Sequence, residues 1–157
     1  MIAILAAALL TAAAAAASVC ALRRRIAVVT VSGTSMLPTL RSGDRVLIRR
    51  ASVDQLRTGQ VVVLEQPRGD FVPASPPPHW PPSRREWLIK RVVAVPGEPL
   101  PETMQAAPGV AGSPVPPGKL LILGDNGAVS LDSRLLGYID AERILGIMIR
   151  PMRTQHG

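Results

Sequence analysis

The 157-residue sequence contains little cysteine and little histidine, and each scarcity argues against a class of site. The single cysteine, Cys20, cannot form an intramolecular disulfide or a cysteine-rich metal site. The two histidines are His79, inside a proline cluster, and His156, the penultimate residue, and neither position favours a fixed, desolvated base. A Ser-His-Asp triad is therefore disfavoured, and we predict a protein that uses no metal and no other cofactor.

Positive charge is in excess, with a formal net charge of +7 and a pI of about 11.2. This balance favours either nucleic acid or an anionic membrane surface as a partner. The basic residues are scattered along the chain, aromatic residues make up only 3%, and no nucleic-acid-binding motif is present. We therefore predict membrane lipids, and not nucleic acid, as partners.

Residues 1–22 form an apolar, alanine-rich run in which residues 2–22 carry no charge. A membrane-spanning helix needs about 20 such residues, so we predict a transmembrane anchor. A cleaved signal peptide is the alternative, disfavoured because the run has no basic residues before it. Arg23, Arg24 and Arg25 follow directly, and the positive-inside rule would place the rest of the chain in the cytoplasm.

Beyond the anchor, short runs rich in β-branched residues alternate with turn residues, which is typical of an all-β domain. We expect a mostly β fold, with one antiparallel β-rich domain over residues 23–150 and a flexible tail over residues 151–157. Helical turns are expected only at residues 53–56 and 140–143. The expected strands cover residues 26–31, 45–49, 60–65, 87–95, 119–123 and 144–149.

Two segments, residues 67–85 and 99–118, contain most of the sixteen prolines. Their composition offers little apolar surface to order a backbone, so we expect loops that are mobile or form a partial lid. Pro76-Pro77-Pro78 is interpreted as a stiff spacer more readily than as a motif for a proline-binding partner.

Ser35 lies between Gly33 and Pro38 in the sequence Val-Ser-Gly-Thr-Ser-Met-Leu-Pro-Thr-Leu, residues 31–40. Glycine permits a positive φ and proline restricts φ, so the serine is expected on a shaped turn. A hydroxyl held in this way suits a nucleophile. Taken alone, the stretch is more typical of a solvated turn rich in serine and threonine, and that interpretation is favoured until a partner for Ser35 is found.

Lys90 is the better of two lysine candidates for a base that could activate Ser35, because it lies within the apolar run of residues 87–95. A lysine acts as a base near neutral pH only if its pKa falls from about 10.4 by some three units, which desolvation can achieve. Lys119 follows a proline-rich loop and is less suited. The alternative is that Lys90 and Arg91 form a solvated strand edge or take part in ion pairs.

Residues 124–134 form a third polar cluster after an apolar run, with the sequence Gly-Asp-Asn-Gly-Ala-Val-Ser-Leu-Asp-Ser-Arg. Asp125-Asn126-Gly127 has strong turn chemistry. Ser130, Asp132 and Arg134 alternate, so they could face one side and hydrogen-bond a neighbouring amine. A hairpin loop with one Asp-Arg ion pair is the competing interpretation.

In this order, the three clusters resemble the motifs of the bacterial type I signal peptidases over residues 28–146. The family's Ser-Met-x-Pro-Thr and Gly-Asp-x-Val segments match residues 35–39 and 43–46, and its Lys-Arg-Val-x-x-x-Pro-Gly segment matches residues 90–97. Its Gly-Asp-Asn and Ser-x-Asp-Ser-Arg segments match residues 124–126 and 130–134.

Three features depart from the family pattern. Gly127 stands where an arginine is common in the family, so the side chain that would brace this turn is missing. Glu98 stands where aspartate is more usual. The segment between Gly97 and Lys119 is far shorter than in larger members, so their accessory β subdomain is expected to be missing.

The resemblance implies that Ser35 is the nucleophile and neutral Lys90 its general base, with an acyl-enzyme intermediate. It also implies that one serine orients the lysine amine and that an aspartate, with either of two arginines, braces the site. These supporting residues are Ser130, Asp132, Arg134 and Arg91.

The oxyanion site is expected to depend on the Ser35 backbone N–H, because Gly33 stands where larger relatives carry an extra hydroxyl. Ser32 or Thr34 would assist as a further donor. Losing one such donor would cost on the order of 3 kcal/mol of transition-state stabilisation.

By resemblance, the substrates are exported precursors whose signal peptides end in small residues, typically Ala-x-Ala, and bind as an added strand. Such cleavage occurs on the outer face of the membrane. The resemblance therefore implies a single-pass cell-membrane protein with an extracytoplasmic catalytic domain, against the indication from the arginines at 23–25.

Three alternatives accompany this hypothesis. A dedicated maturation peptidase of the same family would trim the propeptide of one client. A self-cleaving repressor also uses a Ser-Lys dyad on a β fold, but it requires an N-terminal DNA-binding domain where this chain is apolar. A catalytically inactive peptide-binding module is disfavoured by the presence of both dyad residues.

Overall fold

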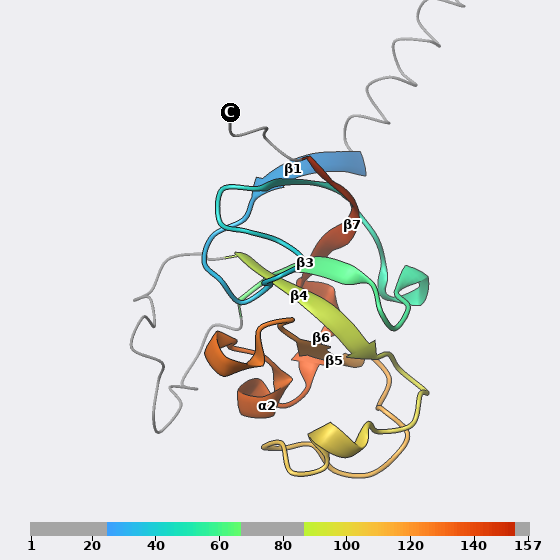
Figure 1. Cartoon of the computed structure of the whole chain (residues 1–157). Coiled ribbons are helices and arrows are strands. Elements are labelled where there is room, and N and C mark those ends of the chain that lie inside the picture. The colour runs from blue at the N-terminus through green and yellow to red at the C-terminus, as the bar shows by residue number, and fades with distance from the viewer. Residues whose placement is uncertain (1–24, 67–86, 153–157) are drawn as a thin grey trace, which may run out of the picture.

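The computed structural model of the chain describes residues 25–66 and 87–152 (Figure 1). Apart from Arg25, which is helical, the helical elements within them are the short α2 (Ser133–Leu136) and the 3₁₀ turns η1 (Val53–Gln55), η2 (Glu102–Met104), η3 (Gly127–Val129) and η4 (Ala141–Arg143). The strands are β1 (Ile26–Thr30), β2 (Arg45–Arg49), β3 (Val61–Glu65), β4 (Trp87–Ala94), β5 (Lys119–Leu123), β6 (Ile139–Asp140) and β7 (Ile144–Met152).

All described strand pairs are antiparallel, and the order across the sheet is β1-β2-β7-β3-β4-β5-β6. The last strand of the chain, β7, lies between β2 and β3 and so connects the N-terminal hairpin to the rest of the sheet (Figure 1). The prediction of a mostly β, antiparallel fold is confirmed.

The middle strand β3 is buried on both faces. Val62 and Leu64 belong to one apolar cluster, and Val61 and Val63 belong to another on the opposite face. A strand covered on both sides needs a continuous apolar run, and the Val-Val-Val-Leu sequence supplies it. The neighbouring strand β4 is therefore held deep in the molecule, and its lysine, Lys90, is removed from water.

The predicted strands agree with the observed ones to within a residue at most ends. Two elements differ. The two-residue strand β6 was not predicted, because a pair this short has no periodicity to recognise. Strand β7 continues through Pro151 and Met152, which we expected in the C-terminal tail; Met152 pairs with Arg45 and Pro151 with Val46 of β2.

Residues 99–118 are an ordered, packed segment, so the expectation of a mobile loop or partial lid was wrong for this stretch. Its side chains Met104, Ala107, Val110 and Val115 are buried and pack with Ala94 and Leu121 of the sheet. The apolar residues are spaced among the prolines and glycines, so burial occurs without a strand or a long helix. None of the described residues in this segment forms a β-strand, as expected without an accessory β subdomain.

Replacing Met104, which is fully buried, tests whether this packing contributes to stability. Met104→Ala is expected to lower the free energy of unfolding by about 2–5 kcal/mol, measured by chemical denaturation. Thr103→Ala, at the exposed neighbouring position, is the control and should have little effect. Equal stability of the two variants would contradict a packed segment.

The predicted membrane anchor (residues 1–22), the first proline-rich loop (67–85) and residues 153–157 lie outside the described residues. Among the residues that are described, no helix is both long and apolar enough to span a bilayer.

Candidate active site

Ser35 is presented by a closed loop that connects β1 to β2. The base of the loop is joined by hydrogen bonds from Val31 N to Asp44 O (2.7 Å) and from Gly43 N to Val31 O (3.0 Å). Met36 is 2% exposed, so the residue after Ser35 is anchored in the core. Gly33 has a φ of +82°, as its place before the serine predicted, and this left-handed conformation lets the chain turn toward Ser35.

Lys90 lies in the middle of β4, paired with Val62 of the central strand, and is only 2% exposed. Its Nζ lies 2.7 Å from Ser35 Oγ, within hydrogen-bonding distance. The two residues are 55 positions apart in the chain and meet because the loop after β1 folds over β4. A buried lysine is rare unless its amine has a partner, and the serine hydroxyl is that partner here.

The surroundings of Lys90 lower the pKa of its amine from 10.5 to about 8. Burial is the largest cause, because it removes water from the charged form. The negative charges of Asp132 and Asp125 oppose this effect, while the positive charge of Arg134 adds to it. Near pH 8, a substantial fraction of Lys90 is therefore neutral and able to accept a proton from Ser35.

Asp132 is fully buried and organises the turn before α2. It accepts hydrogen bonds from Gly124 N (3.0 Å), from Arg134 N (3.2 Å) and from the Arg134 guanidinium at 3.0 and 2.7 Å. Burial raises the pKa of Asp132, but the hydrogen bonds from Arg134 and Gly124 outweigh it and hold the carboxyl ionised. A fixed negative charge is thus maintained close to Lys90.

Arg134 also occupies the space beside Gly127. Its Nη2 donates to Gly127 O at 3.0 Å, and a Cβ added at Gly127 would lie 2.7 Å from Arg134 Nη1. The glycine at position 127 therefore leaves room for Arg134 to brace this turn. The missing arginine noted in the sequence thus does not leave the turn without a bracing side chain.

Ser130 is buried, at 6% exposed; its hydroxyl makes no hydrogen bond of good geometry with a described residue, but it lies beside Asp132 and helps to lower the pKa of that carboxyl. No hydrogen bond joins it to Lys90. It packs tightly against Gly124: a Cβ added there would lie 2.1 Å from Ser130 Oγ and 2.7 Å from the Ser35 carbonyl oxygen. Ser130 thus lies in the same crowded corner as the Ser35 backbone, and its role toward the amine stays a prediction.

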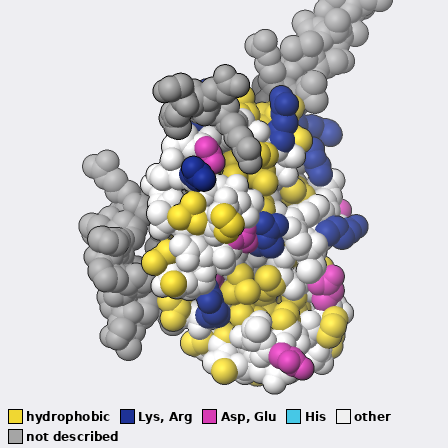
Figure 2. Space-filling model, in the orientation of Figure 1, with side chains coloured by type: hydrophobic (Ala, Val, Ile, Leu, Met, Phe, Trp, Pro, Cys, Tyr) yellow, Lys and Arg dark blue, Asp and Glu magenta, His cyan; other side chains and the backbone are white. Residues whose placement is uncertain are grey.

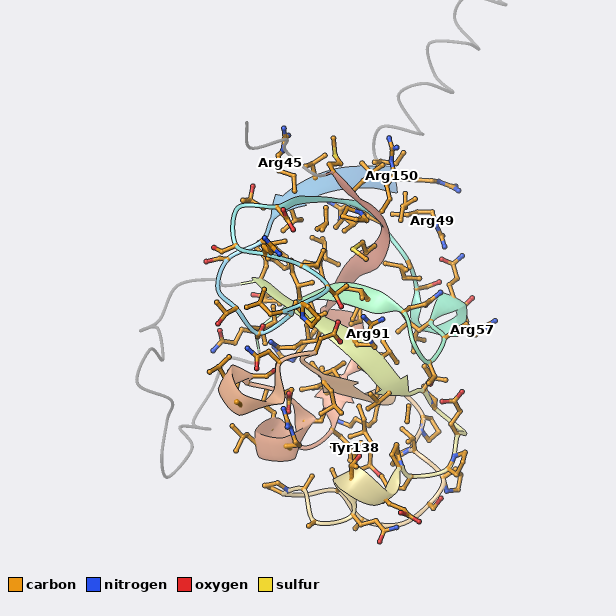
Figure 3. The ribbon with its side chains drawn as sticks, in the orientation of Figure 1. Arg45, Arg49, Arg57, Arg91, Tyr138 and Arg150 are labelled. Atoms are coloured by element: carbon orange, nitrogen blue, oxygen red, sulfur yellow. The ribbon has the colours of Figure 1, made fainter. Side chains whose placement is uncertain are left out.

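Arg91 pairs with Asp125 and not with Asp132. Its Nε and Nη2 donate to the two Asp125 oxygens at 2.8 and 2.7 Å, and its Nη1 donates to Gly59 O at 2.8 Å (Figure 3 labels Arg91). Of the two arginines offered by the sequence as partners for Asp132, Arg134 takes that position. The pairing with Arg91, the largest cause, lowers the pKa of Asp125.

A second contact of Asp125 links it to the loop between β1 and β2 that carries Ser35, which we call the serine loop. Thr39 Oγ1 in this loop donates to Asp125 Oδ2. The adjacent Asn126 donates from its backbone to Ser35 O at 2.9 Å and from its side chain to Thr34 O at 3.2 Å. Sequence reasoning did not assign roles to these three residues. The Gly-Asp-Asn and Pro-Thr motifs were the available signal, but they do not say that the two segments touch.

A groove runs beside Ser35, between the end of β1 with its following loop and the first half of β4. Ser32 is exposed along it, and Thr34 is also exposed, with its carbonyl held by Asn126. Trp87 forms an exposed rim. The lining residues are Thr30, Val31, Ser32, Gly33, Ser35, Met36, Trp87, Leu88, Ile89 and Lys90.

No group of three or more histidine, cysteine, aspartate or glutamate side chains in the described part of the chain is placed to hold a metal ion. The groups gathered at Ser35 are a hydroxyl nucleophile beside a desolvated amine, with two partly buried ion pairs behind it.

Comparison with known proteins gives an independent result. A sequence profile described as "Signal peptidase, peptidase S26" matches residues 2–100 and 99–152. A signal peptidase I of Leptolyngbya laminosa is 33% identical over 135 residues, covering 74% of this chain and 63% of the relative. Signal peptidase IB of Staphylococcus aureus (strain COL) is 29% identical over 154 residues, covering 74% of this chain and 72% of the relative.

The chain thus spans less than two thirds of the length of the Leptolyngbya relative, while the family profile matches nearly the whole chain. The match includes the segments that carry Ser35, Lys90 and the cluster at residues 124–134. On this basis, the chain belongs to the signal peptidase, peptidase S26 family.

Proposed function

We propose that this protein is a membrane-anchored serine endopeptidase that removes N-terminal signal peptides from exported precursors through a Ser35–Lys90 dyad. The observation that carries the proposal is the 2.7 Å separation of Lys90 Nζ and Ser35 Oγ, with the amine buried. A lysine hidden from water next to a serine hydroxyl is poised as a base, because its neutral form is accessible near pH 8.

The proposed reaction has two stages. Neutral Lys90 accepts the Ser35 proton while Oγ attacks the scissile carbonyl carbon; the tetrahedral intermediate then expels the amine of the mature protein, which takes the proton back from Lys90. The signal peptide remains as an ester on Ser35. Lys90 next accepts a proton from a water molecule that attacks the ester carbonyl, and returns this proton to Ser35 Oγ as the C–O bond breaks. The signal peptide leaves as a carboxylic acid, which ionises in water.

The oxyanion of each intermediate needs donors near Ser35. Among the described residues, the Ser35 N–H donates to no partner, so it is available for this role. Gly33 supports it by turning the chain, and Ser32 or Thr34, both exposed beside the groove, would supply a further hydroxyl.

The supporting residues act by holding the amine and the serine loop in place. The Asp132–Arg134 pair keeps a negative charge near Lys90. The Arg91–Asp125 pair connects strand β4, which carries Lys90, to Thr39 of the serine loop. We assign Ser130 the role of orienting the Lys90 amine when substrate occupies the groove; the burial of its hydroxyl beside Asp132 and the Ser35 backbone supports this role.

The substrate groove accepts an extended peptide along the end of β1 and the start of β4. Small residues at the end of a signal peptide suit its shallow floor beside Ser35. Residues 1–22 are proposed to form a single-pass anchor, with the catalytic domain on the extracytoplasmic side. A reporter fused after Gly157 tests this topology, and a cytoplasmic C-terminus would refute it.

The test of the activity uses the full chain purified in detergent and a precursor whose signal peptide ends in Ala-x-Ala. Mass spectrometry should find cleavage after the final alanine. Ser35→Ala should lower the rate by about 10⁶-fold, whereas Ser42→Ala, at an exposed position of the same loop, should retain it. A panel of unrelated precursors then separates a general signal peptidase from a maturation peptidase with one client.

The pH dependence of cleavage follows from the lysine. The pKa of Lys90 is lowered to about 8, and only the neutral amine is a base, so kcat/KM should rise with pH to a plateau with a midpoint near 8. At pH 6 the value should be roughly 100-fold below the plateau. A flat profile between pH 6 and the plateau would exclude Lys90 as the base.

Thr39→Val tests the link between the serine loop and Asp125. The variant keeps the side-chain shape but loses the hydrogen bond to the carboxylate, and kcat/KM should fall by roughly 10-fold. Thr58→Val removes a comparable threonine–carboxylate hydrogen bond, to Glu98, and serves as the matched control. Thr39→Ser should restore activity; equal effects of Thr39→Val and Thr58→Val would contradict a positioning role.

A further inference from the structure

Strand β4 has one edge that is only partly covered, and the substrate groove lies along the uncovered part. β3 pairs with one edge from Trp87 to Arg91, whereas the pairing of β5 with the other edge begins only at Arg91, opposite Leu123. No described strand pairs with this second edge between Trp87 and Lys90, and these residues line the groove. A substrate peptide added here as a strand would lie in line with β5.

The end of β5 limits how far such a peptide can extend. Leu123 occupies the position opposite Arg91, so a peptide whose scissile bond lies beside Lys90 cannot continue along the sheet. Its next residues must leave the sheet over the turn that follows β5. Since an extended residue spans about 3.5 Å, the first two residues of the mature protein reach about 7 Å beyond the cleaved bond.

The 3₁₀ turn η3 (Gly127–Val129) is held at this exit by both of its ends. Asn126, before it, donates its backbone N–H to Ser35 O at 2.9 Å. Ser130, after it, is buried in the corner beside the Ser35 carbonyl, as the close approach of both groups to Gly124 shows. The three residues between them therefore lie next to the nucleophile, although they do not line the groove itself. In Figure 1 they form part of the orange chain below the serine loop and beside α2.

The surface of this turn is apolar and carries no charge. Gly127, Ala128 and Val129 are all exposed, and we call them the exit surface. Val129 is 51% exposed, whereas the next side chain, Ser130, is buried, so the valine is directed away from the core. Figure 2 shows yellow side chains on the molecular surface in the region where Figure 1 has the orange chain. One exposed valine is ordinary on a protein surface, but this one lies where the substrate chain leaves the site.

The charged groups around the exit surface are paired with each other. Arg134 Nη2 donates to Gly127 O, but its charge is paired with Asp132. Asp125 is paired with Arg91 in the same way. A charged side chain on the substrate gains no unpaired partner in these two ion pairs, whereas an aliphatic one is removed from water on the exit surface.

We propose that the exit surface binds the first two residues of the mature protein and favours precursors with an aliphatic side chain there, with Val129 as the residue that determines this specificity. The inference rests on the proposed function, because cleavage beside Lys90 is what places the mature protein at the exit. The mature protein has left once the signal peptide is esterified to Ser35. The exit surface therefore contributes to formation of the acyl-enzyme and not to its hydrolysis.

The test compares precursors with the same signal peptide and with leucine, aspartate or lysine at the first or second position of the mature protein. With the full chain in detergent, kcat/KM should be about fivefold higher for leucine than for either charged residue. Val129→Asp should lower cleavage of the leucine precursor about fivefold and make the lysine precursor about threefold better than the aspartate precursor. Val129→Lys should produce the opposite order of the charged precursors.

Hydrolysis of the acyl-enzyme, followed by mass spectrometry after a single turnover, separates this role from a structural one. Val129 adjoins Ser130, so a disturbed site would slow both stages, whereas loss of a substrate contact should leave hydrolysis unchanged. Val53→Asp, at an exposed valine in the 3₁₀ turn η1, is the matched control and should keep the wild-type preference.

Two results would overturn the inference: equal kcat/KM for the three precursors with the wild type, or an equal change for all three with Val129→Asp. Failure of the proposed function is recognised separately, since the wild type would then cleave none of the precursors.

Discussion

Lys90→Met is expected to lower kcat/KM for precursor cleavage by about 10²–10⁴-fold, the range for loss of a general base. Methionine approximates the length of the lysine stem but cannot accept the Ser35 proton. Because Lys90 Nζ lies 2.7 Å from Ser35 Oγ, the substitution leaves the nucleophile in place without its base. The measurement is steady-state cleavage in detergent at the pH of maximal wild-type activity.

The fold should tolerate this substitution. Burial lowers the pKa of Lys90 from 10.5 to about 8, so the unfolded chain binds the proton more tightly than the folded protein does. The free energy of unfolding of the wild type is therefore expected to rise by about 3 kcal/mol between pH 8 and 10.5. Over this range the Lys90 amine is already neutral in the folded protein and loses its proton in the unfolded chain. An apolar side chain has no such cost, so Lys90→Met should unfold no more easily than the wild type at pH 7.

Lys119→Met is the matched control, since it removes the only other lysine, which is partly exposed and paired with Asp140. Its cleavage rate should remain close to the wild-type value, because the Lys119–Asp140 pair lies on β5 and β6, away from the serine loop. Wild-type activity of Lys90→Met would refute the dyad, and comparable losses in both lysine variants would point to a general effect of charge.

Gly124→Ala is expected to lower kcat/KM by roughly 100-fold, the cost of displacing a reacting group by about 1 Å. The added Cβ would lie 2.1 Å from Ser130 Oγ and 2.7 Å from the Ser35 carbonyl oxygen, so one or both must move. Since the Ser35 carbonyl also accepts the Asn126 N–H, its displacement would carry the serine loop away from Lys90.

The free energy of unfolding of Gly124→Ala should fall by about 1–3 kcal/mol through overpacking. Gly97→Ala provides the comparison: its φ of +85° strains an alanine, by about 1–2 kcal/mol, but open space surrounds the added methyl group. We expect similar losses of stability in the two variants and a loss of activity only in Gly124→Ala. Full activity of Gly124→Ala would show that this corner does not position Ser35.

Most of the strands could be predicted from local pattern. β2 and β5 were predicted with their observed ends, because each is a short run with an apolar centre that begins directly after a turn containing glycine. Residues 99–118 were misjudged for a related reason: their apolar residues are too widely spaced to form a periodic pattern, yet four of them are buried against the sheet. Composition does not reveal which isolated side chains share a cluster.

The candidate site, like the fold, could be predicted only in part. Ser35, Lys90 and Asp132 could be chosen from residue chemistry and family motifs, and all three lie together in the structure. The contact of Thr39 with Asp125, 86 positions apart, could not be foreseen. Such a contact depends on how the loop after β1 and the turn after β5 approach each other, which local sequence does not encode.

By itself, the sequence determined the chemical groups of this protein: one serine on a turn, one lysine in an apolar strand, and an aspartate with arginines behind them. Only the tertiary structure decided what these groups can do. It pairs Arg134 with Asp132 and Arg91 with Asp125, and it buries Lys90 beside Ser35. The physical reason is desolvation: a lysine becomes a usable base only where the packed sheet and the folded loop remove water from its amine.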